Sequence, residues 1–296
     1  MKEMNDKIVS GAIVALVTPF ETGGARVDRA AWLRLLEWHA SAGTGAIVVA
    51  GTTGESATLE ADERDWLLQS AADSVSARCA VIAGTGSAST ATTIALSRRA
   101  AKLGADAVLV ATPYYNRPPQ RGLLAHYRAI ADDCEVPLIL YNVPSRTAVD
   151  IAPETALALA DHPGISGIKE AVADMDRVRR YAQAGLAVLS GDDPSALEAM
   201  RNGAAGVISV ASNVAPGLMA RMCRLAAAGD FEAAGVINAR LEPLYRFLAL
   251  ESNPIPVKWL LSTAGYIGPD LRLPLVELDE AHHAGGRRLL ESLVEE

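Results

Sequence analysis

The sequence predicts a (β/α)8 barrel that is followed by a helical appendage. Three observations support this fold: eight short apolar runs, helical segments between them, and glycines where the helical segments end. Barrels of this kind commonly take roughly 250 residues. The chain has 296 residues, so its length accommodates one barrel and an appendage.

The eight apolar runs are rich in valine, isoleucine and alanine. Each is long enough for a strand and too short for a helix. Their near-continuous hydrophobicity is typical of parallel strands that are buried on both faces. An open doubly wound sheet is the alternative, but it would be expected to carry a GxGxxG turn after its first strand, where VTPFETGG stands instead. The runs span residues 13–18, 46–51, 80–85, 107–113, 138–144, 164–171, 187–193 and 206–212.

Helical segments separate the apolar runs. In residues 28–42, Asp28 is a candidate N-cap, apolar residues recur at helical spacing, and Gly43 is expected to end the helix. Similar glycines precede later runs, at Gly104, Gly185 and Gly203. The sequence beyond the eighth run is mainly helical, and its last three helices are predicted to form the appendage. We therefore expect a catalytic barrel at residues 1–228 and a C-terminal helical region at residues 229–296.

Composition and charge limit the class of partner. Hydrophobic residues make up 50% of the chain and charged residues 21%, which suits a large core with a soluble surface. The formal net charge is -8, and no run of lysine or arginine occurs. Binding of nucleic acid depends on clustered positive charge, so it is not expected. Small molecules are the expected partners.

The chain shows no sign of export, membrane insertion or a bound cofactor. The N-terminus MKEMNDKIVS lacks the pattern of a signal peptide, and no apolar run is long enough to cross a membrane. Its three cysteines are widely spaced, unlike a disulfide framework, so a cytoplasmic location is expected. No histidine lies at a predicted strand end or in HExxH spacing, and residues 83–89 lack the lysine of a phosphate-binding loop. We predict neither a metal nor another cofactor.

Lys169 is the central candidate for chemistry. It stands near the end of the sixth predicted strand, and active sites of (β/α)8 barrels lie at the C-terminal strand ends. One interpretation is a lysine that reaches solvent or pairs with an acid. The other is a buried amine that loses its proton readily and attacks a carbonyl to form a Schiff base. Position alone leaves both interpretations open.

Polar residues also follow the second and fifth predicted strands. The stretch GTTGES at 51–56 offers N–H groups and hydroxyls that could hold a carboxylate, although such residues are also common in a capped turn. Tyr141 could relay protons and Arg146 could clamp a carboxylate, although a core aromatic and a solvated loop charge are the ordinary alternatives. Their convergence with Lys169 favours function. Tyr115, after the fourth strand, is either an active-site aromatic or a residue that packs a long loop or a subunit contact, and taken alone the packing interpretation is favoured.

Four segments of the sequence are distinctive in combination: GTTGES (51–56), YNVPSRT (141–147), GIKEA (167–171) and NPIPVK (253–258). Together they resemble the dihydrodipicolinate synthases. These belong to a pyruvate-dependent lyase family that also contains N-acetylneuraminate lyase and sugar-acid aldolases. The resemblance spans nearly the whole chain and implies a (β/α)8 barrel that forms an imine between Lys169 and pyruvate. It implies condensation of pyruvate with L-aspartate 4-semialdehyde to 4-hydroxy-tetrahydrodipicolinate, the first step of the diaminopimelate route to lysine.

The resemblance also implies roles for further catalytic residues. Tyr141 would pass protons, and Thr52 would link it to Tyr115. In the family, the equivalent of Tyr115 reaches in from a neighbouring subunit. A homotetramer built as a dimer of dimers is therefore expected.

Four more residues would bind substrates. Thr53 would help to hold the pyruvate carboxylate, while Gly191 and Ile208 match positions that line the pyruvate site. Arg146 would meet the carboxylate of the semialdehyde, and family lyases generally lack it. An N-acetylneuraminate or sugar-acid lyase with the same imine chemistry is the alternative, and Arg146 argues against it. A binding protein without turnover is disfavoured by the intact set of catalytic residues.

The feedback site of lysine-inhibited family members is largely missing. Those members carry histidines, an asparagine and a glutamate there. This chain retains only Tyr114, so weak or absent inhibition by lysine is expected. The replaced positions are Ala61, Arg64, Ala88 and Thr92.

Overall fold

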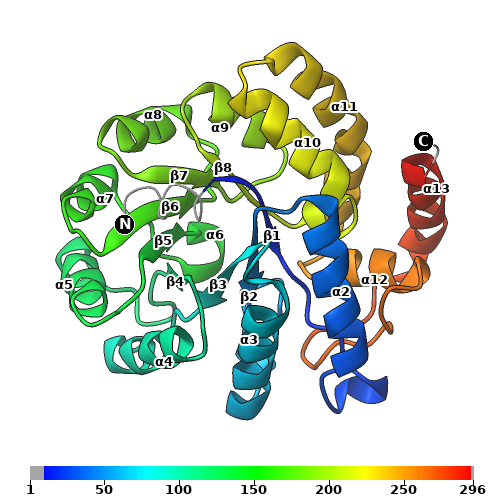
Figure 1. Ribbon diagram of the computed structural model, residues 1–296, viewed down its shortest axis with the longest axis horizontal. Coiled ribbons are helices and arrows are strands. Elements are labelled where there is room, and N and C mark those ends of the chain that lie inside the picture. The colour runs from blue at the N-terminus through cyan, green and yellow to red at the C-terminus, as the bar shows by residue number, and fades with distance from the viewer. Residues whose placement is uncertain (1–9, 295–296) are drawn as a thin grey trace.

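A computed structural model describes residues 10–294 and shows a closed barrel of eight parallel strands (Figure 1). The strands pair in chain order, and pairing of the first with the eighth closes the barrel. The predicted (β/α)8 barrel is confirmed, because closure excludes an open doubly wound sheet. The strands are β1 (Gly11–Ala15), β2 (Ala46–Val49), β3 (Ala80–Gly84), β4 (Ala107–Ala111), β5 (Leu138–Asn142), β6 (Ile165–Glu170), β7 (Ala187–Ser190) and β8 (Gly206–Ser209).

Helices surround the barrel and cover its outer face (Figure 1). They are α2 (Arg29–Ala42), α3 (Ala61–Val75), α4 (Thr90–Lys102), α5 (Gln120–Ala131), α7 (Pro153–Ala160), α8 (Met175–Gln183), α9 (Ala196–Arg201) and α10 (Pro216–Ala227). The single turn α6 (Pro144–Thr147) follows β5, and short 3-10 turns lie at Thr22–Gly24, Ser56–Thr58, Ala211–Asn213 and Glu280–His282. Among residues 10–294 no helix has the length and apolarity to cross a membrane.

Local signals set the helix ends. Asp28 caps α2 because its Oδ1 accepts the N–H of Ala31 at 2.9 Å. Gly43 ends the same helix in a left-handed conformation, with φ of 83°, which glycine adopts without a steric penalty. The first strand differs from the apolar run at 13–18: it ends at Ala15, and the N–H of Val17 donates to the side chain of Asn213 (3.1 Å) instead of to a neighbouring strand.

Alternation along the strands divides the core into two layers. One cluster of buried side chains lies between the strands and the outer helices, and a smaller cluster fills the barrel. Tyr141 and Ile208 belong to the inner cluster. Lys169 is paired in register with Tyr141 on one side and with Leu189, another member of the inner cluster, on the other. Alternation therefore directs Lys169 into the barrel.

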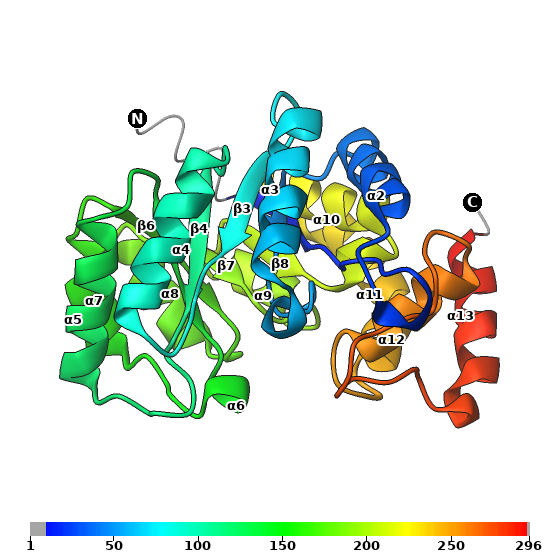
Figure 2. The same ribbon diagram turned by 90° about the horizontal axis from the view of Figure 1, so that it is seen from below.

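The last three helices are α11 (Phe231–Leu248), α12 (Ile255–Thr263) and α13 (His283–Val294). The first of them packs along α9 and α10, while α12 contacts α11, α13 and the 3-10 turn after β8. Figure 2 places α12 and α13 together at one end of the molecule. Because α11 packs on α9 and α10, the C-terminal helical region contacts the outer helices of the barrel directly. The division of the chain into a barrel at residues 1–228 and a helical region at residues 229–296 stays a prediction.

Candidate active site

Lys169 is buried inside the barrel without an acidic partner. Its exposed fraction is 6%, and among residues 10–294 it forms no ion pair. The Nζ atom lies over the ring of Tyr141, 4.3 Å from the ring centroid. The ordinary alternatives of a solvent-exposed or acid-paired lysine therefore do not describe this residue. An amine in this setting is available to react with a carbonyl compound that enters the barrel.

Gly191 provides the space that the Lys169 side chain occupies. A Cβ atom at position 191 would lie 3.0 Å from Lys169 Cε and 3.0 Å from Ala171 Cβ, closer than van der Waals contact allows. Ile208, which is 1% exposed, completes the inner wall on β8. The structure thus brings Lys169, Tyr141, Gly191 and Ile208 together at the inner surface of the barrel.

The two threonines after β2 stand on a tight turn. The N–H of Glu55 donates to the carbonyl of Thr52 at 3.1 Å and closes this turn. Thr53 is 3% exposed, and its Oγ1 accepts a hydrogen bond from Asn253 Nδ2 at 2.9 Å. A hydroxyl that accepts one bond keeps its own proton for another, so Thr53 can still donate to a carboxylate.

A cavity of about 550 Å³ opens at the C-terminal ends of the strands. Thr52 and Arg146 line it, together with Ala111 and Val143, which also pack against the inner cluster that contains Tyr141. Arg146 is exposed and donates to the carbonyl of Asn253 at 3.2 Å. The cavity therefore leads from an exposed guanidinium towards the barrel interior. A small carboxylate-bearing molecule fits this combination of size and charge.

Tyr115 is not part of this cavity in a single chain. Its side chain is 96% exposed and its φ is 69°. Tyr114 lines the cavity and is 48% exposed. The structure of one chain therefore does not bring Tyr115 to Thr52, and the Tyr115 ring is open to contact by a second chain.

Arg64 occupies the part of the cavity next to Tyr114. Its guanidinium donates to the carbonyls of Ser56 (2.8 Å) and Gly84 (3.2 Å), and burial lowers its pKa. These bonds hold the side chain across the wall of the cavity. Ala61 begins α3, while Ala88 and Thr92 lie before and within α4, so none of them adds a charged group.

A buried ion pair that was not predicted from the sequence lies behind the threonine turn. Lys258 Nζ lies 2.6 Å from Glu55 Oε1, and both side chains are almost completely buried. Removal from water lowers the pKa of Lys258, while Glu55 opposes this effect. Glu55 lies in the GTTGES segment and Lys258 lies in the NPIPVK segment. A lysine within the apolar stretch IPVKWLL was the available signal, because an unpaired charge is rarely buried.

A second polar network joins the ends of β5 and β6 on the outer face of the barrel. Asn142 Nδ2 donates to Glu170 Oε1 (2.9 Å) and to Asp150 Oδ1 (2.8 Å). Burial raises the pKa of Glu170 to about 7. Asn142 and Glu170 follow Tyr141 and Lys169 directly in sequence, so the network fixes the backbone that carries the two candidate catalytic residues.

Within residues 10–294, no group of three or more histidine, cysteine, aspartate or glutamate side chains could hold a metal ion. His39 and His126 are buried, and desolvation lowers their pKa values to about 3 and about 4. Both imidazoles are therefore neutral at ordinary pH. Their contacts lie between helices, away from Lys169, with His39 beside Thr44 and His126 beside Thr90.

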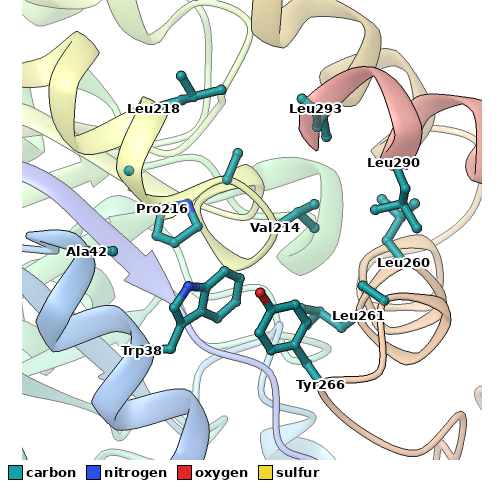
Figure 3. Close-up of a pocket in the computed structure, with 13 residues that line it drawn as sticks. Trp38, Ala42, Val214, Pro216, Leu218, Leu260, Leu261, Tyr266, Leu290 and Leu293 are labelled. Atoms are coloured by element: carbon teal, nitrogen blue, oxygen red, sulfur yellow. The ribbon is translucent and has the colours of Figure 1, made fainter. Parts of the chain in front are cut away.

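A second pocket, of about 360 Å³, lies between α2, α10, α12 and α13 (Figure 3). Trp38 stacks on Tyr266 at its edge, with ring centroids 4.2 Å apart, and leucines such as Leu218 and Leu290 form the walls. None of its lining residues is charged. This pocket therefore lacks the cation that Arg146 supplies to the cavity above the barrel.

Comparisons with known proteins agree over the full length of the fold. The model of the Dihydrodipicolinate synthetase family matches residues 8–293. The chain is 53% identical over 286 residues to a 4-hydroxy-tetrahydrodipicolinate synthase of Acidithiobacillus ferrooxidans, covering 96% of this chain and 97% of that protein. A chloride-inhibited dihydrodipicolinate synthase of Acinetobacter baumannii, crystallised with pyruvate, is 45% identical with a TM-score of 0.94, covering 96% and 99% of the two chains. A monomeric dihydrodipicolinate synthase variant is 40% identical with a TM-score of 0.94, covering 97% and 98%.

Proposed function

Because the chain belongs to the dihydrodipicolinate synthetase family, we propose that it condenses pyruvate with L-aspartate 4-semialdehyde to give 4-hydroxy-tetrahydrodipicolinate. This reaction begins the diaminopimelate route to lysine and makes the protein a Schiff-base-forming lyase. The observation that carries the proposal is the buried amine of Lys169 inside the barrel, which has no acidic partner among residues 10–294 and has a tyrosine ring at 4.3 Å.

The chemistry starts on the Lys169 amine. The amine adds to the C2 carbonyl of pyruvate, and loss of water gives the imine. The imine draws electrons from the methyl group, which loses a proton to give the enamine. The enamine carbon then forms a bond to the aldehyde carbon of the semialdehyde, whose oxygen takes up a proton. Finally the amino group of the semialdehyde attacks the imine carbon, closes the ring and releases the Lys169 amine.

Tyr141 is the proton carrier of this scheme. Its ring packs on Lys169 Nζ, so its hydroxyl belongs to the same inner space as the imine. In our proposal Thr52 connects Tyr141 to Tyr115, which comes from a neighbouring chain. Near-complete exposure of Tyr115 supports this arrangement, since a single chain leaves the ring without a packing partner.

Substrate carboxylates bind at two places. Thr53 holds the pyruvate carboxylate, and Gly191 and Ile208 bound the space around the imine. Arg146 holds the carboxylate of the semialdehyde at the mouth of the cavity. The exposed position of its guanidinium supports a role in capturing the second substrate rather than in the chemistry.

An N-acetylneuraminate or sugar-acid lyase is the weaker alternative. It would use the same imine, but a cavity that Arg146 lines suits a substrate with a second carboxylate. The relatives described above carry the synthase name. We therefore place the reaction in the direction of condensation.

The exposed Tyr115 favours an oligomer, and we propose a homotetramer arranged as a dimer of dimers. One similar structure is a monomeric variant, so assembly needs its own measurement. We further propose a cytoplasmic location, which suits biosynthesis from two soluble metabolites, and binding to neither nucleic acid nor membranes.

The direct test couples turnover to dihydrodipicolinate reductase and follows loss of NADPH. Wild-type protein with pyruvate and aspartate 4-semialdehyde should turn over, and Lys169→Ala should not. Borohydride with pyruvate should add one pyruvyl group to the wild type and none to Lys169→Ala, as measured by intact mass. Wild-type protein that is trapped by pyruvate but inactive with the semialdehyde would redirect the assignment to sugar-acid cleavage.

A further inference from the structure

We infer that the buried Lys258–Glu55 ion pair positions the pyruvate-binding turn, so that the C-terminal helical region forms part of the active site. The inference rests on the proposed function, in which Thr53 holds the pyruvate carboxylate. Lys258 and Glu55 are positioning residues, because they act on the substrate only through the turn that carries Thr52 and Thr53.

The turn cannot hold its conformation by local preference alone. Glu55 has a φ of 53°, which is the left-handed region that residues with a side chain rarely adopt. Ala50, just before the turn, has the same value. Such backbone persists where surrounding structure fixes it. Backbone bonds within the turn contribute to this, from Glu55 N–H to the carbonyl of Thr52 and from Ser56 N–H to the carbonyl of Gly51, and Thr18 Oγ1 donates to the carbonyl of Gly54 at 2.8 Å. The side chain of Glu55 adds contacts to the C-terminal region.

Both oxygens of the Glu55 carboxylate are held by the C-terminal region. Oε1 binds Lys258 Nζ at 2.6 Å, and Oε2 accepts the backbone N–H of Arg272 at 3.1 Å. The side chains of Lys258 and Glu55 are 0% and 1% exposed. Water therefore cannot replace either contact, and the carboxylate has one favourable position.

The aromatic ring of Phe20 limits the movement of the cations. Lys258 Nζ and the guanidinium carbon of Arg272 each lie 4.3 Å from its centroid. Arg272 is fixed in turn by Glu63, with both guanidinium NH groups 2.6 Å from carboxylate oxygens. The ion pair is thus anchored to the barrel as well as to α12.

Movement of Glu55 would be passed directly to the threonines. The N–H of Glu55 donates to Thr52, and Asn253, which precedes α12 on the same segment as Lys258, donates to Thr53. These partners are separated from the turn by about two hundred residues in sequence: 203 for Lys258 and 200 for Asn253. The position of the carboxylate-binding hydroxyl therefore depends on how the C-terminal region packs.

The Lys258–Glu55 ion pair is not expected to stabilise the fold more than two uncharged side chains of similar size would. Replacement of both members of a buried ion pair by neutral groups is often tolerated, whereas loss of one member leaves an unpaired buried charge. We therefore expect Glu55→Gln/Lys258→Met to fold and Lys258→Met alone to be much less stable. The double variant therefore tests the effect of the pair on the position of the turn without a large loss of folding stability.

The experiment measures the pyruvate concentration that half-saturates borohydride trapping, with thermal unfolding measured in parallel. We expect the double variant to need at least about tenfold more pyruvate, with kcat at saturation within about threefold of wild type, because the turn is displaced while Lys169 is untouched. Glu37→Gln/Arg78→Met removes an exposed ion pair between α2 and the loop that follows α3 and is the control, with half-saturation expected to be unchanged.

Each outcome decides a different question. Half-saturation in the double variant within about twofold of wild type would overturn the inference, because the turn would then not depend on the pair. A double variant that does not fold would also overturn it, since the pair would then serve the stability of the fold. Wild-type protein that is never trapped by pyruvate would instead refute the proposed function, on which the inference rests.

Discussion

Tyr141 and Lys169 are register partners on adjacent parallel strands, and the lysine Nζ lies 4.3 Å from the centroid of the tyrosine ring. Adjacent positions on β5 and β6 place both side chains inside the barrel at the same height. The ring of Tyr141 therefore packs against the amine of Lys169 inside the barrel. This pair is the geometric basis of the proposed imine chemistry.

Tyr141→Phe should keep the ring over Lys169 and remove the hydroxyl. We expect kcat to fall by about 10² to 10⁴, the usual contribution of a positioned proton-transfer group. Borohydride trapping with pyruvate should still label the variant, since the amine is intact. Tyr127→Phe is a matched control, because its hydroxyl is also buried but donates to the carbonyl of Val110. Unchanged kcat in Tyr141→Phe would contradict the assigned role.

Gly191→Ala should impair the enzyme without unfolding it. The added Cβ would lie 3.0 Å from Lys169 Cε, so the lysine must move. Misplacement of a reacting group by about 1 Å can cost about 10²-fold in rate, and the shift needed here is a few tenths of an ångström, so we expect kcat/KM to fall by up to about tenfold. Gly235→Ala, within α11 and with no atom within 4 Å of the added Cβ, should leave kcat/KM unchanged. Full activity in Gly191→Ala would show that the space is not needed.

Mixing two inactive variants should restore activity if Tyr115 serves a neighbouring chain. Lys169→Ala lacks the amine, and Tyr115→Phe lacks the hydroxyl. In a mixed oligomer, the chain with Tyr115→Phe keeps its own Lys169 and receives an intact Tyr115 from its partner. Co-refolded mixtures should therefore turn over faster than either variant alone, measured in the coupled assay. No gain from mixing would place Tyr115 outside the neighbour's site.

Lysine should inhibit weakly or not at all. Arg64 holds the cavity wall through Ser56 and Gly84, and Ala61, Ala88 and Thr92 bring no group to bind the two charged ends of lysine. Initial rates with rising lysine, at fixed substrates, should stay level through the submillimolar range. Clear inhibition at submillimolar lysine would require a binding site elsewhere.

Glu170→Gln should change how stability depends on pH. Burial raises the Glu170 pKa from 4.5 to about 7, so the folded state favours the protonated form. That stabilisation is complete below pH 4.5 and is lost as pH rises through about 7, because the unfolded chain releases its proton first. The difference in free energy of unfolding, variant minus wild type, should therefore rise by up to about 3 kcal/mol over this interval.

Comparison with the wild type is essential for this pH test. The pKa values of His39 and His126 are lowered in the folded state, so their contribution to the free energy of unfolding falls as pH falls. This change is opposite in sign to the one expected for Glu170. The difference in free energy of unfolding between Glu170→Gln and the wild type cancels the contribution of the two histidines, since both proteins contain them. Urea unfolding at several pH values provides the measurement, and a difference that stays flat between pH 4.5 and 7 would contradict the assignment to Glu170.

Much of the fold was predictable because strands and helix ends leave local patterns in the sequence. Buried parallel strands appear as apolar runs, and helix ends appear as a cap such as Asp28 or a glycine such as Gly43. Lys169 was identifiable for the same reason, as a charged residue within an apolar strand. The bounds of β1 were not, because Val17 leaves the sheet to bond with Asn213, a partner 196 residues away.

The barrel and the candidate lysine could be predicted from the sequence, since each depends on periodicity or on position within a strand. Three features emerged only from the folded chain: the space that Gly191 leaves for Lys169, the exposure of Tyr115, and the burial of Lys258 against Glu55. These features arise where distant segments meet. Packing and desolvation depend on all neighbours of a residue at once, and no local pattern records which neighbours the folded chain supplies.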